Sequence, residues 1–291
     1  MARQAEAIEG RAPTLGPTLG TMAYLERSEV GARIFYQERG EGPAILLING
    51  LSQSTANWMS QVSALSERYR VVTFDSRGQG RSDLGNRPLS LDEHVDDILA
   101  LMDHLGIDRV HPVGFSHGAR IGLRLAAAHP RRVGRLVVTG MGADDGLFRR
   151  TLIRVWREVL RLGGVEALAW CSLTDILSQG FLELHAADIE TMVQTTVKRN
   201  STEGLSAMLD GLMNYPASLE DARLIQAPTL VCSADKDPLC SEQAADRLAI
   251  AIPNVRHVRF TNCGHTIPIE QPRRWREEVL GFLDIARRTG E

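Results

Sequence analysis

The chain has 291 residues, enough for one large domain or two small ones, and its apolar share of 43% allows a sizeable core. Its formal net charge of −3 excludes the strong basic excess of most nucleic-acid-binding proteins. No apolar run approaches the roughly 18 residues of a membrane span, and the four cysteines show no C-x-x-C spacing. We therefore expect no nucleic-acid partner, no membrane contact, no metal site, and reduced thiols in a cytoplasmic protein.

The predicted elements begin after a leader. Residues 1–21 are expected to be flexible, because Pro-Thr-Leu-Gly occurs twice in succession and no apolar signal segment is present. From residue 22 to 142, and again from 222 to 291, short apolar runs alternate with amphipathic stretches, which indicates a parallel sheet covered by helices. The expected strands are Ala32–Glu38, Ala44–Ile48, Val71–Phe74, Val110–Phe115, Val133–Thr139, Pro228–Cys232 and Val255–Phe260. The expected helices are Leu91–Leu105, Ala119–Ala128 and Arg274–Ala286.

Residues 143–221 interrupt this alternation. No strand is predicted there, whereas Leu152–Leu162, Val165–Leu173 and Asp188–Lys198 have helical periodicity. We expect a helical lid (cap) over the carboxyl ends of the strands.

A candidate nucleophile stands in Gly114-Phe115-Ser116-His117-Gly118, which follows an apolar strand and opens a helix. This is the G-x-S-x-G nucleophile elbow in its required context. The turn is sharp, so the residues two positions before and after Ser116 must lack bulk. The serine side chain would then project above the sheet edge.

A serine nucleophile needs a base within hydrogen-bond reach. His265 follows the strand Val255–Phe260 in a loop, where catalytic groups gather on such sheets. Solvent-facing or capping roles are expected for the histidines at 94, 104, 111, 129, 185 and 257. The side chain of His117 should point away from Ser116 Oγ, and its expected contribution is its backbone N–H.

An acid is needed to orient the base. Asp235 and Asp237 both follow the strand Pro228–Cys232, and Asp237 precedes a proline, which constrains its backbone. Asp237 is the preferred acid, with Asp235 and the pair Asp144/Asp145 as alternatives. An oxyanion hole needs two N–H donors, expected from His117 and, after Ala44–Ile48, from Leu51.

These residues resemble the α/β-hydrolase superfamily, in the branch of small esterases, 3-oxoadipate enol-lactonases, cofactor-free haloperoxidases and meta-cleavage hydrolases. The resemblance covers Tyr24 to Leu283 and includes Asp75-Ser76-Arg77-Gly78-Gln79-Gly80-Arg81-Ser82, similar to the family's D-x-R-G-x-G-x-S loop. It implies a mostly parallel eight-stranded sheet flanked by helices, with the lid inserted after the sixth strand. It also favours Asp237 as the acid, three residues after the small Ala234.

Two departures from that family pattern matter. Asn49-Gly50 replaces the usual His-Gly of the oxyanion loop, with Ser52 in place of a common proline, and asparagine can still brace the loop by hydrogen bonds. A serine at the elbow also argues against dehalogenases and epoxide hydrolases, which resemble this branch but use a carboxylate nucleophile.

The expected activity is hydrolysis of a carboxylic ester, lactone or thioester through an acyl-enzyme, on a small-molecule acyl substrate and without a cofactor or metal. C–C bond hydrolysis or a lyase step with the same Ser116, Asp237 and His265 is the alternative, because fold alone does not decide between them. An acyl transferase would need only a pocket that favours another acceptor over water.

Overall fold

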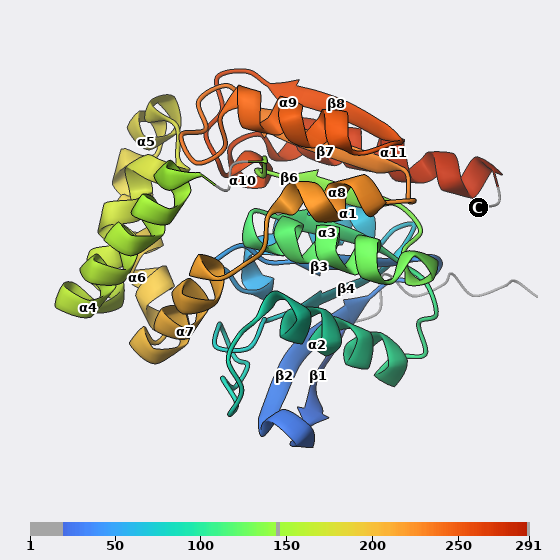
Figure 1. The fold of residues 1–291 in the computed structure, drawn as a ribbon, viewed down its shortest axis with the longest axis horizontal. Coiled ribbons are helices and arrows are strands. Elements are labelled where there is room, and N and C mark those ends of the chain that lie inside the picture. Colours follow the sequence, from blue (N-terminus) through green and yellow to red (C-terminus); the bar gives the residue numbers. More distant parts are fainter. Residues whose placement is uncertain (1–19, 144–145, 290–291) are drawn as a thin grey trace, which may run out of the picture.

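The computed structural model describes residues 20–143 and 146–289, with side chains up to residue 284. An eight-stranded sheet lies at its centre, in the order β1-β2-β4-β3-β5-β6-β7-β8 (Figure 1). Its strands are β1 (Thr21–Arg27), β2 (Ala32–Arg39), β3 (Ala44–Ile48), β4 (Arg70–Phe74), β5 (Val110–Phe115), β6 (Leu136–Thr139), β7 (Thr229–Ala234) and β8 (Val255–Phe260). Only the β1–β2 and β2–β4 pairs are antiparallel. The predicted fold class, a mostly parallel eight-stranded sheet, is therefore confirmed.

Helices cover both faces of the sheet. One face carries α2 (Leu91–His104), α3 (His117–Ala128), α8 (Ser218–Leu224) and α9 (Glu242–Ala251), and the other carries α1 (Met59–Leu65), α10 (Ile267–Glu270) and α11 (Pro272–Thr289). Successive strand residues point to opposite faces, so Leu46 and Ile48 of β3 join the first core and Ile45 and Leu47 the second. Among the described residues, no helix has the length and apolar character needed to cross a bilayer.

The edge strand β1 was not located by the sequence analysis. Residues 1–19 of the expected leader lie outside the described residues, and Thr21 already belongs to β1. Only Leu25 and Arg27 of β1 are buried. Because the strand pairs along one side only and is mostly exposed, it lacks the continuous apolar run by which buried strands are recognised.

The strand expected at Val133–Thr139 begins later, at Leu136. His111 on β5 explains the difference, because its Nδ1 accepts the Arg135 N–H at 2.9 Å and removes it from strand pairing. His111 and His94 on α2 are both buried, so the expected solvent-facing or capping roles are wrong for these two residues. Burial lowers the pKa of His111 to about 4, because an imidazolium there would lose its hydration.

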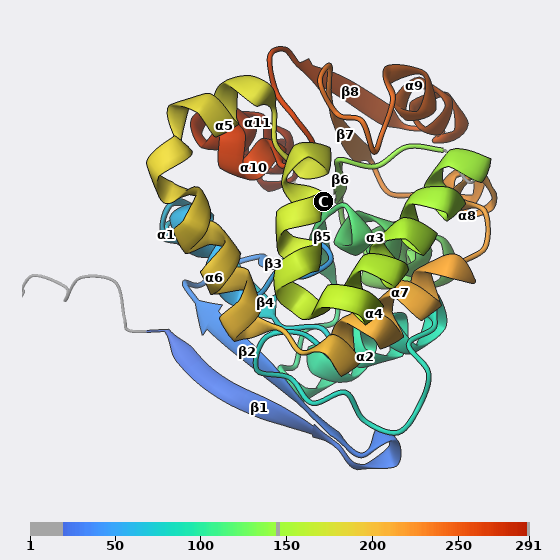
Figure 2. The ribbon, with the colours of Figure 1, turned by 90° about the vertical axis from the view of Figure 1, so that its left-hand side faces the viewer.

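Five described α-helices lie between β6 and β7, and the first four form one group: α4 (Leu147–Ile176), α5 (Gln179–Leu184), α6 (Ile189–Arg199) and α7 (Thr202–Met213). Figure 1 shows them together beside the sheet, and Figure 2 shows them from that side, in front of it. We call α4–α7 the helical insertion. Two of the predicted helices correspond to the halves of α4, which is kinked at Gly164 by a positive φ of 69°. The insertion has its own small core of Ile153, Trp156, Leu160, Val165, Leu168, Leu205 and Leu209.

The described residues between 143 and 221 add no strand to the sheet. A single bridge joins Asn200 to Gln79 in the loop after β4. The expected lid boundary at residue 221 falls inside α8, which packs against α3 and α9 of the core.

Two glycines let α7 approach the core closely. A Cβ atom at Gly204 would lie 2.0 Å from the carbonyl oxygen of Gly78, and one at Gly211 would lie 2.1 Å from that of Leu89. Residues seven apart lie on the same face of a helix. The backbone of α7 therefore rests directly on the backbone of core loops.

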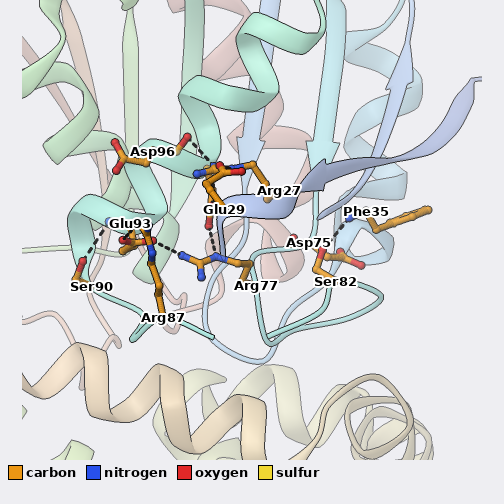
Figure 3. A network of polar contacts seen from close by, with 11 residues as sticks. Arg27, Glu29, Phe35, Asp75, Arg77, Ser82, Arg87, Ser90, Glu93 and Asp96 are labelled. Atoms are coloured by element: carbon orange, nitrogen blue, oxygen red, sulfur yellow. Dashed lines mark hydrogen bonds and ion pairs between the residues drawn. The ribbon is translucent and has the colours of Figure 1, made fainter. Parts of the chain in front are cut away.

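The loop after β4 is held by buried polar contacts (Figure 3). Asp75 accepts the N–H of Thr55 at 2.6 Å on one carboxylate oxygen and that of Arg81 at 2.9 Å on the other. Ser82 Oγ donates to the carbonyl oxygen of Asp75 at 2.6 Å and accepts the N–H of Phe35 at 2.8 Å. These contacts fix the loop beside the carboxyl end of β4.

Arg77 of the same loop is fully buried and ties it to α2 (Figure 3). Its Nε donates to Asp97 at 2.7 Å and an NH2 group to Glu93 at 2.9 Å. Arg27 at the end of β1 donates to the other oxygen of Asp97 at 2.8 Å. Removing one partner would leave a buried charge uncompensated, at a cost of about 3–5 kcal/mol, so these contacts are structural.

Candidate active site

Ser116 stands at a strained turn between β5 and α3. Its φ of 52° and ψ of −113° lie in a region that costs a non-glycine residue about 1–3 kcal/mol. Its N–H donates to the carbonyl oxygen of Thr139 at 2.8 Å. A Cβ atom at Gly114 would lie 2.5 Å from the Gly118 oxygen, and one at Gly118 would lie 2.2 Å from the Ile48 oxygen. The chain can therefore make this turn only with glycine at both positions.

His265 lies in the loop between β8 and α10, with 4% of its surface exposed. Its Nδ1 lies 2.8 Å from Asp237 Oδ2. Its Nε2 is buried and has no hydrogen-bond partner among the described residues. Ser116 and His265 line the same cavities, although no hydrogen bond joins their side chains. Such bonds are often long in the absence of substrate.

Asp237 is fixed on both carboxylate oxygens. While Oδ2 contacts His265, Oδ1 accepts the N–H groups of Leu239 at 2.8 Å and Cys240 at 3.0 Å. Only 6% of Asp237 is exposed. Both oxygens therefore act as hydrogen-bond acceptors, so the proton in the contact with His265 lies on Nδ1. That leaves His265 Nε2 as the basic nitrogen.

Asp235, the alternative acid that the structure describes, does not contact His265. Asp235 turns away, because one of its oxygens accepts the Cys263 N–H at 3.3 Å and the other lies 3.8 Å from Lys236 Nζ. Asp144 and Asp145 lie outside the described residues.

Two backbone N–H groups flank Ser116. His117 is the first residue of α3, so its N–H has no carbonyl partner within the helix. The N–H of Leu51, in the turn after β3, makes no hydrogen bond within the described chain. Both residues line the smaller cavity beside Ser116. The helix N-terminus adds partial positive charge at the same place.

Asn49 braces the turn that carries Leu51. It is fully buried, its Nδ2 donates to the Phe74 carbonyl oxygen at 2.8 Å, and its Oδ1 accepts from Trp58 Nε1 at 2.7 Å. The asparagine therefore joins the ends of β3 and β4 by hydrogen bonds. Such bracing is what we expected of an asparagine at the position of the family's usual histidine.

The imidazole ring of His117 faces away from the reacting centre. Its Nε2 lies 2.9 Å from the hydroxyl of Tyr215, and its ring meets that of His94 edge-on at 5.0 Å. Burial lowers the pKa of His117 to about 3, so the ring is neutral near pH 7. Burial also raises the pKa of Tyr215 and lowers that of His94.

Glu270, the last residue of α10, connects the His265 loop to the helical insertion. Its Oε2 accepts the hydroxyl of Ser178 at 2.5 Å and the N–H of Gly264 at 3.0 Å. Its Oε1 accepts the N–H of Ser178 at 3.2 Å and the hydroxyl of Thr266 at 3.4 Å. One carboxylate thus binds both residues that flank His265, together with the start of α5. Sequence reasoning missed it, because nothing local relates residue 270 to residue 178.

Two cavities open at Ser116. The smaller has a volume of about 130 Å³ and the larger about 330 Å³. Both are lined by Ser116 and His265 and by side chains of α4, so they lie between the sheet edge and the helical insertion. Trp156 of α4 lines both cavities.

Fold and site together define an enzyme of the hydrolase class, with a serine at a strained strand-to-helix turn. The chain belongs to the alpha/beta hydrolase fold family, whose model matches residues 43–272. It is 32% identical over 253 residues to a putative carbamate hydrolase RutD of Caulobacter segnis, covering 83% of this chain and 91% of that protein. It is 29% identical over 287 residues to a 2-hydroxy-6-oxononadienedioate/2-hydroxy-6-oxononatrienedioate hydrolase of Pseudomonas putida, covering 90% and 95%.

Solved structures agree with this assignment. The enol-lactonase from Burkholderia xenovorans LB400 superposes with a TM-score of 0.83 at 28% identity, covering 90% of this chain and all of that one. The resemblance to the α/β-hydrolase superfamily is therefore confirmed, and the relatives named for an activity are hydrolases.

Proposed function

We propose that the protein is a serine hydrolase that cleaves a carboxylic ester, lactone or thioester of a small molecule through an acyl-enzyme on Ser116. The observation that carries the proposal is the buried contact between Asp237 and His265, which leaves a basic Nε2 facing the cavity of a strained serine. A buried carboxylate–imidazole pair beside a serine is the arrangement that activates a hydroxyl nucleophile.

The mechanism follows from the positions of these groups. His265 Nε2 takes the proton of Ser116 Oγ as the oxygen attacks the carbonyl carbon. The oxyanion that forms accepts hydrogen bonds from the N–H groups of Leu51 and His117. Asp237 stabilises the imidazolium, which then protonates the leaving group as the tetrahedral intermediate collapses. Water, deprotonated by His265, releases the acid and restores Ser116.

The relatives leave a second reaction to be considered. The Pseudomonas putida relative is named as a hydrolase of a hydroxy-oxo dioic acid, and the Caulobacter segnis relative as a putative carbamate hydrolase. Cleavage of a C–C bond next to a carbonyl group by the same three residues is therefore the alternative function. We also propose the cytoplasmic location expected from the sequence, because a chain of this length needs no disulfide framework for its stability.

The test is covalent labelling combined with a substrate panel. A fluorophosphonate should add once to the protein by intact mass, and Ser116→Ala should abolish the adduct. Ser76→Ala, which removes a buried hydroxyl just after β4, is the matched control and should keep it. Labelling that survives Ser116→Ala would contradict the assignment of the nucleophile.

The panel contains p-nitrophenyl esters, an aliphatic lactone, a thioester, a carbamate and a vinylogous 1,5-diketone acid. Hydrolysis of the acyl compounds, lost by several orders of magnitude in Ser116→Ala, supports the proposal. Turnover of the diketone acid alone would favour the C–C hydrolase. Asp237→Asn should lower kcat by roughly 10⁴-fold, whereas Asp235→Asn should leave it close to wild type.

A further inference from the structure

The two cavities at Ser116 differ in size and share one boundary. Besides Ser116 and His265, the residues that line both are Leu51, Trp156 and Leu239. An ester, lactone or thioester places one substituent on each side of its reacting carbonyl group. Two cavities that meet at the nucleophile can therefore each take one side of the substrate.

Trp156 is held in place from both halves of α4. It packs with Ile153 and Leu160 in the core of the helical insertion and is 8% exposed. Its Nε1 donates to Asp175 Oδ2 at 2.9 Å, and Asp175 lies beyond the kink at Gly164. Because both its ring and its N–H are bound, the side chain is a fixed wall between the cavities.

The smaller cavity fits only a compact group. Apolar side chains such as Met141, Phe148 and Leu152 line it, together with Arg120 and Arg149. Apolar cavities of about 150 Å³ hold one benzene-sized molecule, so its volume of about 130 Å³ corresponds to roughly six carbon atoms or fewer.

The larger cavity is more than twice as large and has a mixed lining. Leu173 and Phe181 contribute apolar surface, and Ser172, Thr191 and Thr195 contribute hydroxyl groups. It can therefore hold a longer substituent that carries polar atoms.

We propose that Trp156 is a specificity-determining residue that separates two unequal subsites, so that the substrate is an acyl compound with one short side and one longer side. The inference rests on the proposed serine mechanism. Each subsite keeps one side of the scissile bond, because the oxyanion donors fix the carbonyl oxygen and His265 must reach the leaving group. Bulk is therefore tolerated on one side only.

The experiment is a matrix of esters in which acid and alcohol lengths vary independently from two to ten carbons. Each added methylene that does not fit the cavity should lower kcat/KM by roughly 10-fold or more. The wild type should lose at least roughly 100-fold in kcat/KM when the short side grows to ten carbons, and little when the other side does. Trp156→Ala joins the cavities and should reduce that loss to below roughly 10-fold.

Two further variants separate a subsite boundary from a folding role. Trp156→Phe keeps an aromatic wall but loses the hydrogen bond to Asp175, and it should retain the one-sided preference even if its Tm falls. Leu239→Ala opens the same boundary between the cavities from the core. It should also let the short side of the ester grow, and it replaces Trp156→Ala in the test if that variant does not fold.

The outcomes are distinct. Equal tolerance on both sides in the wild type, or a uniform loss for all esters in Trp156→Ala and Leu239→Ala, would overturn the subsite proposal. No turnover of any ester, with no labelling of Ser116, would instead overturn the serine mechanism on which it rests.

Discussion

Replacing Glu270 with glutamine should lower activity more than stability, because Glu270 helps to position His265. The carboxylate accepts four hydrogen bonds, two on each oxygen, and glutamine has only one carbonyl oxygen. A hydroxyl can rotate to accept from the new NH2 group, but in either orientation of the amide one backbone N–H, that of Gly264 or that of Ser178, loses its acceptor. Gly264 is buried, and an orphaned N–H costs about 1–3 kcal/mol.

A loss of about 2 kcal/mol corresponds to a fall in Tm of about 4–8 °C for a chain of this size class. The activity should fall further than stability alone explains, because Gly264 adjoins His265 and a displacement of about 1 Å at a catalytic group can cost 100-fold in rate. We expect kcat for a short p-nitrophenyl ester to fall by roughly 10- to 100-fold, with KM nearly unchanged.

Ser178→Ala is the matched control. It removes the hydroxyl on the insertion side and leaves Glu270 bound to Gly264 and Thr266. It should lower Tm by a similar amount, while kcat stays within about threefold of wild type. Calorimetry and initial rates measure both. Parallel losses of Tm and kcat in the two variants would show that Glu270 only stabilises the fold.

Two further predictions concern burial. Because the native pKa of His111 is about 4 and the unfolded value about 6.5, the unfolded state binds a proton that the native state does not, and stability falls as pH drops from about 6.5 to 4. Between pH 7 and 5, urea unfolding of His111→Asn should show a loss in the free energy of unfolding that is smaller than in the wild type by on the order of 2 kcal/mol. The exposed His104→Asn variant should lose as much as the wild type. If the free energy of unfolding depends on pH equally in the wild type and both variants, native His111 binds the proton. Gly118→Ala, whose methyl would meet backbone atoms, should abolish ester hydrolysis, whereas Gly122→Ala one turn later, which meets a leucine methyl at 3.2 Å, should keep activity and Tm.

The sequence predicted most of the strands that the structure describes. Strands β3, β5 and β8 were predicted with their observed bounds. Every residue of β3 and β5 is buried, because helices cover both faces of the sheet at these strands. The elbow was predictable because only glycine fits two positions before and two positions after Ser116.

The features that the sequence could not predict depend on contacts between segments that are distant in the chain. Glu270 acquires its role from Ser178, 92 residues away, and Trp156 from two cavities that exist only once α4 lies over the sheet. His94 and His111 were misjudged because histidine is usually found at least partly exposed. Their burial follows from tertiary neighbours, such as the Arg135 N–H that His111 accepts.

The close approach of α7 to the core determines which part of the helical insertion can move. Lifting α7 would break the backbone contacts at Gly204 and Gly211 along its whole length, so this helix is anchored. We expect any movement of the helical insertion to occur in α5 and α6, the segment between the kinked α4 and the anchored α7. Amide hydrogens of α6 should therefore exchange with solvent faster than those of α7, and widening the entrance by substitution is best attempted at α5 and α6.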